Sequence, residues 1–122
     1  MTKAYEIQRD PFVVPTTDGK IIKEHFGNAS LNHGDYSIAH MIAPPGWGEP
    51  FQTPEFDEIS IIVSGKKMFE IGDEKITLEK GESIIIKSGT RVRYSNPFEE
   101  PVEYMSICIP AFNLEKAHRE AE

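Results

Sequence analysis

The chain has 122 residues, a formal net charge of −7 at pH 7 and an isoelectric point near 5.1. This length is enough to bury one hydrophobic core and too short for two ordinary domains, so we expect a single domain over residues 1–122. The excess of acidic residues repels phosphate backbones and anionic lipid head groups, which argues against nucleic acid and membranes as partners.

The sequence also indicates a cellular location. The opening stretch MTKAYEIQRDP has no apolar segment of the secretory type, and no apolar run approaches the roughly 20 residues of a membrane span. Cys108 is the one cysteine, so it forms no internal disulfide, and we expect it to be a small, unreactive, buried side chain. We therefore expect a cytoplasmic protein.

Short apolar runs separated by Gly, Pro, Asn and Asp predict an all-β protein. Pro44, Pro45 and Gly46 end one run, because proline cannot donate to a strand ladder. Gly72-Asp73 is typical of a two-residue hairpin turn. We expect strands over residues 12–14, 20–26, 36–43, 58–63, 66–71, 75–78, 83–87, 91–95 and 102–109.

The last ten residues change character. Asn113 is a good helix cap, and residues 114–121 are rich in helix formers, so we expect a short C-terminal helix. The expected organisation is N-terminal strands and a loop over 1–35, a barrel core over 36–112 and a helix within 113–122. Lys66-Lys67 is interpreted as a charged strand edge that prevents pairing between molecules.

One stretch of the chain follows the spacing of a known metal-binding motif. Gly46, Gln52, Pro54, Glu58 and Gly65 lie where the first motif of the cupin superfamily has Gly, His, His, Glu and Gly. The chain thus resembles a cupin in which the glycines and the acid remain while both histidines have been replaced.

A second stretch, GESIIIKSGTRVRYSN, resembles the second cupin motif. Gly81, Gly89 and Asn96 match it, whereas Lys87 replaces its proline and Val92 replaces its histidine. The resemblance covers roughly residues 36–112 and includes small bacterial cupins related to ethanolamine-utilisation proteins. It implies a double-stranded β-helix, or jelly-roll barrel, and a homodimer formed partly by the N-terminal strands.

The replacement of the motif histidines argues against a bound metal. A transition metal needs three or four nitrogen, oxygen or sulfur ligands in a fixed array, and the motifs leave only Glu58 and the weak ligand Gln52. We expect no metal and no cofactor. A metal-dependent cupin with substituted ligands is the weaker alternative, for which His40 would have to supply a ligand from another strand.

Strand alternation predicts which side chains enter the barrel. If Glu58 points inward, Ser60 shares its face, and if Val92 points inward, Tyr94 does too. The strand over 36–43 has two possible faces, and we expect the face with Tyr36 and His40 to line the barrel, because its side chains are larger.

These residues favour metal-independent acid–base chemistry. A carboxylate among apolar side chains has its charged form disfavoured, so Glu58 is suited to moving protons, and His40 is the other candidate. The pair predicts a lyase, isomerase or dehydratase acting on a small polar metabolite. The candidate substrate-binding residues are Gln52, Tyr94, Tyr36, Trp47 and Ser60.

A non-catalytic alternative stays open: the same cavity would sense or carry a small molecule. In that case Glu58 only accepts hydrogen bonds inside the barrel, and His40 is a satisfied structural histidine. Trp47 is either a lid over the cavity or part of a subunit interface, because aromatic side chains favour both places.

Overall fold

The computed structural model describes residues 4–30 and 34–121. Over these ranges it contains nine strands and one helix: β1 (Phe12–Val13), β2 (Ile21–Phe26), β3 (Ser37–Ala43), β4 (Asp57–Ser64), β5 (Lys66–Ile71), β6 (Glu74–Glu79), β7 (Ser83–Ile86), β8 (Val92–Ser95), β9 (Val102–Ile109) and α1 (Leu114–Ala117). The all-β prediction is confirmed.

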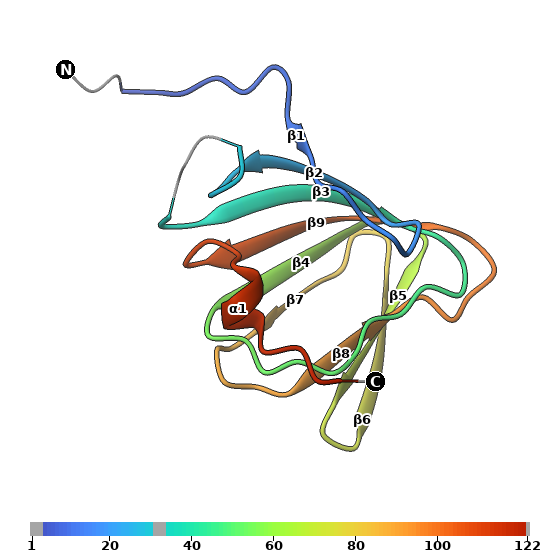
Figure 1. Cartoon of the computed structure of the whole chain (residues 1–122). Coiled ribbons are helices and arrows are strands. Elements are labelled where there is room, and N and C mark those ends of the chain that lie inside the picture. The colour runs from blue at the N-terminus through green and yellow to red at the C-terminus, as the bar shows by residue number, and fades with distance from the viewer. Residues whose placement is uncertain (1–3, 31–33, 122) are drawn as a thin grey trace.

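The strands form two antiparallel sheets that face each other (Figure 1). The larger sheet has the order β1-β2-β3-β9-β4-β7, and the smaller one has the order β6-β5-β8. Neighbours in these sheets come from distant parts of the chain, since β3 and β4 both pair with β9. This arrangement is the expected jelly-roll barrel.

The smaller sheet corrects one prediction. The sequence places Lys66-Lys67 at a charged edge, but β5 is the middle strand, with β6 on one side and β8 on the other. Alternation along β5 leaves Lys66 exposed and turns Lys67 into the barrel, where it is 1% exposed.

The register of β3 against β9 corrects a second prediction. The inward face of β3 is that of Ser37 and Ala39, which are buried, and the face of His40 points away from the barrel. Ala39 lies opposite Ser106, and the next inward residue along β3, Met41, lies opposite Tyr104. Two of the inward residues of β3, Ser37 and Ala39, are small, and they line the cavity together with Met41.

One end of the barrel is filled by apolar side chains. The buried cluster there consists of Ala43, Trp47, Ile62, Phe69, Ile86, Val92, Tyr94, Val102 and Tyr104. A smaller cluster of Phe56, Cys108 and Ala117 lies under the helix, with Phe112 packed against it. Members of both clusters, Tyr94 and Tyr104 of the larger and Cys108 of the smaller, line an internal cavity.

Two residues of the resemblance motifs have structural roles. Gly65 has φ +78°, and a Cβ at this position would lie 2.3 Å from the carbonyl oxygen of Pro101, so only glycine fits. Asn96 is fully buried, and its side-chain amide donates to the carbonyl oxygens of Ala43 (3.3 Å), Pro44 (3.2 Å) and Glu100 (2.8 Å). Both residues thus hold the segment Glu100–Pro101, which leads into β9.

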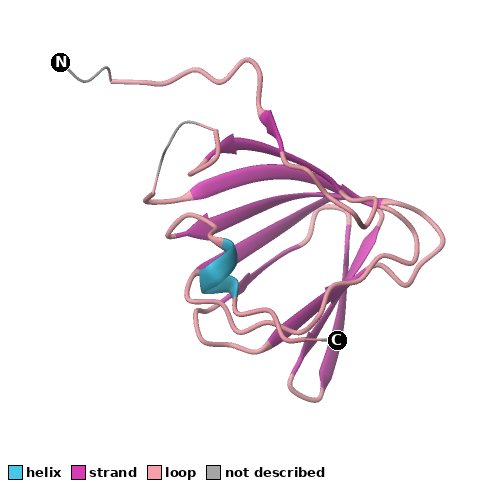
Figure 2. Ribbon diagram, in the orientation of Figure 1, coloured by secondary structure: helices cyan, strands magenta, loops and turns pink. Residues whose placement is uncertain are grey.

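The C-terminal helix is present and shorter than expected (Figure 2). Asn113 caps it as predicted, since its Oδ1 accepts from the backbone N–H of Glu115 at 2.9 Å. The helix ends at Ala117 because His118 adopts a left-handed conformation with φ 52°. The chain after it runs along residues 51–55, where the N–H of Glu120 donates to the carbonyl of Phe51 at 2.8 Å.

Within the described ranges, no helix has the length and apolar character needed to cross a membrane.

Candidate functional site

A cavity of about 90 Å³ lies between the two sheets. Its walls come from β2, β3, β4, β5, β8 and β9, together with residues from the loop before β4 and from the C-terminal segment. The Lys, Arg, Glu and Gln side chains among its lining residues are Lys20, Glu24, Glu49, Gln52, Glu58, Lys67 and Arg119. The cavity is therefore far more polar than the apolar tube with one acid that the sequence suggested.

Glu58 is held in the cavity by two hydroxyl groups. The hydroxyl of Tyr94 donates to Oε1 at 3.1 Å, and that of Ser106 donates to Oε2 at 2.7 Å. The residue is 9% exposed, so both carboxylate oxygens have a fixed partner inside the barrel. Tyr94 belongs to the smaller sheet and Ser106 to the larger one, which fixes the carboxylate from both sides.

The second ionisable group is Lys67. Its ammonium lies over three aromatic rings, 3.6 Å from the ring centroid of Tyr104, 4.6 Å from that of Tyr94 and 5.0 Å from that of Phe69. Burial lowers the pKa of Lys67 to about 7, and the negative charge of Glu58 opposes part of this shift. Lys67 therefore changes protonation state near neutral pH.

The same environment raises the pKa of neighbouring acids. Burial raises the pKa of Tyr94 well above its usual value, and Glu58 adds to this through its charge and their hydrogen bond. Burial also raises the pKa of Cys108, again assisted by Glu58, so this thiol stays protonated. Tyr94 is thus a hydrogen-bond donor here and not a source of phenolate.

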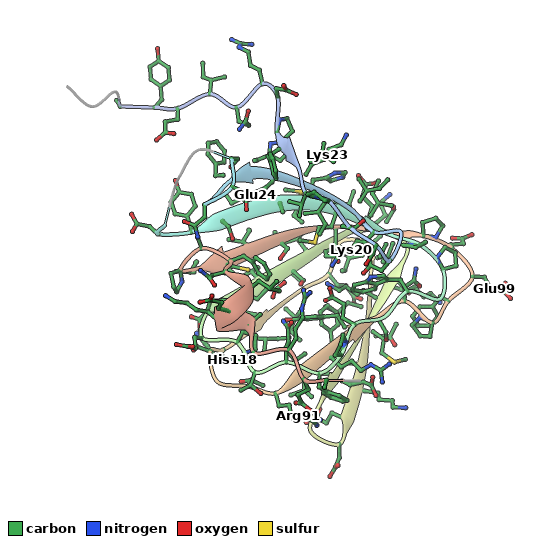
Figure 3. The ribbon with its side chains drawn as sticks, viewed as in Figure 1. Lys20, Lys23, Glu24, Arg91, Glu99 and His118 are labelled. Carbon is green, nitrogen blue, oxygen red and sulfur yellow. The ribbon has the colours of Figure 1, made fainter. Side chains whose placement is uncertain are left out.

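A buried ionic group lines another part of the cavity. Glu49 Oε2 accepts from Lys20 Nζ at 2.9 Å and from the guanidinium of Arg119 at 3.1 Å. Lys20 directly precedes β2, and Glu24 lies within β2; Figure 3 labels both residues. The carboxylate of Glu24 is engaged by the N–H groups of Ala29 (2.9 Å) and Ser30 (2.8 Å).

Gln52 is 2% exposed and lines the cavity. Its backbone forms two hydrogen bonds with Val92, and its side-chain oxygen accepts from Arg119 Nε at 3.2 Å. Gln52 therefore links β8 to the C-terminal segment.

Three other predicted binding residues, Ser60, Trp47 and Tyr36, do not line the cavity. Ser60 is buried on the inward face of β4, as alternation predicts. Trp47 is buried in the closed end, where its indole N–H donates to Asp18 Oδ2 at 2.8 Å and Lys20 lies over its ring at 4.6 Å. It is neither a lid nor an exposed interface residue, and Tyr36, which is 38% exposed, precedes β3.

His40 lies outside the cavity. Its Nε2 pairs with Glu103 Oε2 at 2.6 Å on the outer face of the larger sheet, where the two side chains are 25% and 36% exposed. The prediction that the His40 face lines the barrel is therefore wrong, because β3 presents its alternate residues to the cavity.

The residues at the cupin metal positions do not fit a transition metal. Val92 and Pro54 offer no ligand atom, the Gln52 side-chain oxygen already accepts from Arg119, and Glu58 is engaged by two hydroxyl groups. Within residues 4–30 and 34–121, no three His, Cys, Asp or Glu side chains converge as a possible metal site. A single carboxylate falls short of the three or four donors that such ions require.

The sequence interpretation missed five Lys, Arg and Glu residues of the cavity: Lys20, Glu24, Glu49, Lys67 and Arg119. A signal was present for Lys67, because Lys67 and Phe69 share one face of β5 and an inward Phe69 implies an inward Lys67. No local signal existed for the ionic group, whose members lie 29 and 70 residues apart along the chain.

Residues 39–108 match the family model described as Cupin domain. The endoribonuclease YbeY of Myxococcus xanthus (strain DK1622) is 40% identical over 108 residues, which are 88% of this chain and 37% of that protein. The chain thus spans little more than a third of that relative, and the activity in its name is that of the whole protein.

Solved structures share the architecture. Streptomyces Pac13, a nucleoside dehydratase of which a variant is solved with uridine, aligns with a TM-score of 0.74 at 16% identity, over 98% of this chain and 92% of that chain. A putative ethanolamine utilization protein Q from Salmonella typhimurium aligns with a TM-score of 0.60 at 14% identity, over 76% of this chain and 71% of that chain. At these identities the likeness concerns the fold.

Proposed function

Because the chain belongs to the cupin family, whose domain model matches residues 39–108, we propose that it acts on a small polar metabolite by acid–base chemistry in the barrel. The reaction type is that of a metal-independent lyase, isomerase or dehydratase. Such reactions need one group that removes a proton and one that donates a proton.

One observation carries the proposal: Glu58 and Lys67 line the same small cavity. Glu58 is the proposed base, oriented by the hydroxyls of Tyr94 and Ser106. Lys67, with a pKa of about 7, is the proposed acid that protonates a leaving hydroxyl or a developing enolate. Lys67 thus takes the role that the sequence suggested for His40.

The remaining cavity groups suit the binding of polar substituents. Gln52 and Arg119 carry donors, and Glu49 carries an acceptor, at the wall of the cavity. Buried polar groups of this kind discriminate strongly against ligands that leave them unpaired. The volume of about 90 Å³ restricts the enclosed part of the ligand to a few heavy atoms, since a known cavity that binds benzene measures about 150 Å³.

The likeness to Pac13 supports including dehydration among the candidate reactions, since that protein is a nucleoside dehydratase. Ribonuclease activity is left out, because the chain spans 37% of the Myxococcus relative and its net charge of −7 opposes RNA binding. Fold alone does not fix a substrate, so the ligand class is defined by the cavity.

Hydrogen exchange can reveal the reaction before its product is identified. Small hydroxy-aldehydes, hydroxy-ketones and hydroxy acids are incubated with the protein in D₂O, and NMR follows the loss of C–H signals and of water. The wild-type protein should exchange or dehydrate at least one compound. Glu58→Gln and Lys67→Met should each slow the reaction by about 10²-fold or more, as for removal of an acid or base.

Matched variants make the result specific. Lys66→Met, next to Lys67 but exposed, and His40→Asn, on the outer face, should both keep the wild-type rate. Exchange that survives Glu58→Gln would contradict the proposal. Saturable binding without exchange would instead support the non-catalytic sensor or carrier.

We further propose a homodimer, with a second copy on the outer face of the larger sheet. Exposed apolar residues there are Ile61 (39%), Val63 (40%), Ile85 (48%) and Ile109 (48%), and the N-terminal strands add Val13 (61%). Ile61 lies next to Met105 in the strand register, and Ile59 lies next to both Ile85 and Ile107. Contiguous exposed apolar surface of this kind supports a protein partner.

A further inference from the structure

Lys67 combines two properties that lysines rarely share: it is 1% exposed, and it lines an internal cavity of about 90 Å³. We propose that Lys67 is a covalent binding site for a short aldehyde or ketone, whose carbonyl carbon condenses with Nζ to form an imine. This inference rests on the proposed function, because it names carbonyl compounds as the substrate class of the same cavity.

Burial removes most of the hydration that favours the charged form of Nζ, and the nearby ring faces stabilise only part of that charge. The rings of Tyr104, Tyr94 and Phe69 lie 3.6, 4.6 and 5.0 Å from it, measured to their centroids. An amine in such apolar surroundings loses the hydration that favours its charged form, and desolvated lysines are the ones that act as nucleophiles. With a pKa of about 7, roughly half of the Lys67 side chains are neutral at pH 7.

The condensation balances with groups that line the cavity. The lone pair of Nζ forms the C–N bond while the C=O π electrons move to oxygen, and a proton passes from nitrogen to that oxygen. The C–O bond then breaks as water leaves with a second proton, and the nitrogen lone pair completes the C=N bond. Glu58, fixed by Tyr94 and Ser106, is the group that shuttles these protons, and nothing is oxidised or reduced.

An imine at Lys67 would also strengthen the proposed chemistry. The C=N⁺ bond of the protonated imine withdraws electrons, which makes the adjacent C–H more acidic and facilitates loss of a neighbouring hydroxyl. The cavity of about 90 Å³ matches a three- or four-carbon carbonyl compound, because it is smaller than the roughly 150 Å³ that enclose benzene.

The test traps the imine in the folded wild-type protein. The chain is incubated with propanal and sodium cyanoborohydride at pH 7, and peptide mass spectrometry measures the propyl group gained at each lysine. Lys67 should be labelled at least about 10-fold faster than the exposed Lys66 and Lys23. The labelling rate at Lys67 should reach half its maximum near pH 7.

Two variants complete the design. Lys67→Met should lose the fast label, and Lys66→Met should keep it. Labelling of Lys67 no faster than of Lys66 would overturn the inference. If that occurs while the D₂O exchange still depends on Glu58 and Lys67, the imine fails and the acid–base proposal stands. Fast labelling of Lys67 without any exchange in D₂O would support the imine site and contradict the proposed catalysis.

Discussion

The hydroxyl of Tyr94 donates a hydrogen bond of 3.1 Å to the carboxylate of Glu58, and this bond joins the two sheets of the barrel. Tyr94 lies on β8 and Glu58 on β4, so the contact crosses the interior. The ring of Tyr94 also lies beneath the ammonium of Lys67 at 4.6 Å. One side chain therefore contacts both ionisable groups of the proposed site.

Tyr94→Phe should lower the free energy of unfolding by about 1–3 kcal/mol, because the buried carboxylate of Glu58 loses one of its two hydroxyl donors. Urea denaturation measures this change. Tyr5→Phe is the control, since Tyr5 is 64% exposed, and it should leave the stability unchanged. Equal stability of Tyr94→Phe and the wild type would mean that the bond contributes nothing to folding.

Lys67 should make stability depend on pH. The unfolded chain keeps the ordinary lysine pKa of 10.5, whereas folding lowers it to about 7. Between these values the unfolded state binds more protons, so the free energy of unfolding rises with pH over this window. The cost of burying the charged form is fully present below pH 7 and amounts to about 5 kcal/mol in total.

Lys67→Met removes this cost, so its stability relative to the wild type should be greater at pH 6 than at pH 9 by about 2–3 kcal/mol. Urea denaturation of both proteins at the two pH values gives the difference, in which the titration of other groups largely cancels. Lys66→Met, on the exposed face of β5, should give a difference that does not vary with pH. A pH-independent effect of Lys67→Met would contradict the lowered pKa.

Glu49→Gln should destabilise the protein by about 3 kcal/mol, because it removes the negative charge between Lys20 and Arg119. Lys20 is 6% exposed, so its charge would remain buried without compensation. The loss should persist at high salt, since buried pairs are poorly screened. Glu120→Gln, which breaks an exposed pair with Arg91, is the control and should have little effect.

Gly65→Ala should be among the most destabilising single substitutions in the chain. It combines a φ of +78° with a Cβ placed 2.3 Å from the carbonyl oxygen of Pro101, so we expect a loss of about 3 kcal/mol or more. Gly81→Ala separates the two effects, because Gly81 has φ +87° and open space around its Cα. That variant should lose only about 1–2 kcal/mol. Thermal unfolding measures the loss of stability in both variants. Equal losses would mean that the contact with Pro101 contributes nothing.

The proposed dimer predicts a sedimentation mass of two chains at micromolar concentration. Ile61→Lys together with Ile85→Lys should shift the mass toward one chain, because each places a charge on the outer face of the larger sheet. Lys75→Glu, exposed on β6 of the smaller sheet, is a control for changed surface charge and should leave the mass unchanged. A wild-type mass of one chain would refute the dimer.

Local patterns in the sequence determined much of the fold. The strands, the turn at Gly72-Asp73 and the cap at Asn113 follow from residue preferences and alternation over a few neighbours, and all lie where the sequence predicts them. The inward position of Glu58 was instead assumed from the cupin resemblance, and alternation then placed Ser60 and Ile62 on the same face. The strands, turn and cap depend on interactions between residues that are close in the sequence.

The composition of the cavity was decided only by the tertiary structure. Whether Ala39 or His40 faces inward is set by the pairing with β9, in which Ala39 lies opposite the cavity residue Ser106 and His40 lies opposite Met105. Lys20, Glu49 and Arg119 converge from three distant segments, and their charges tolerate burial only together. The sequence shows which residues of a strand share a face. Whether a charged residue on that face can be buried depends on an oppositely charged side chain from a distant segment, which only the tertiary structure reveals.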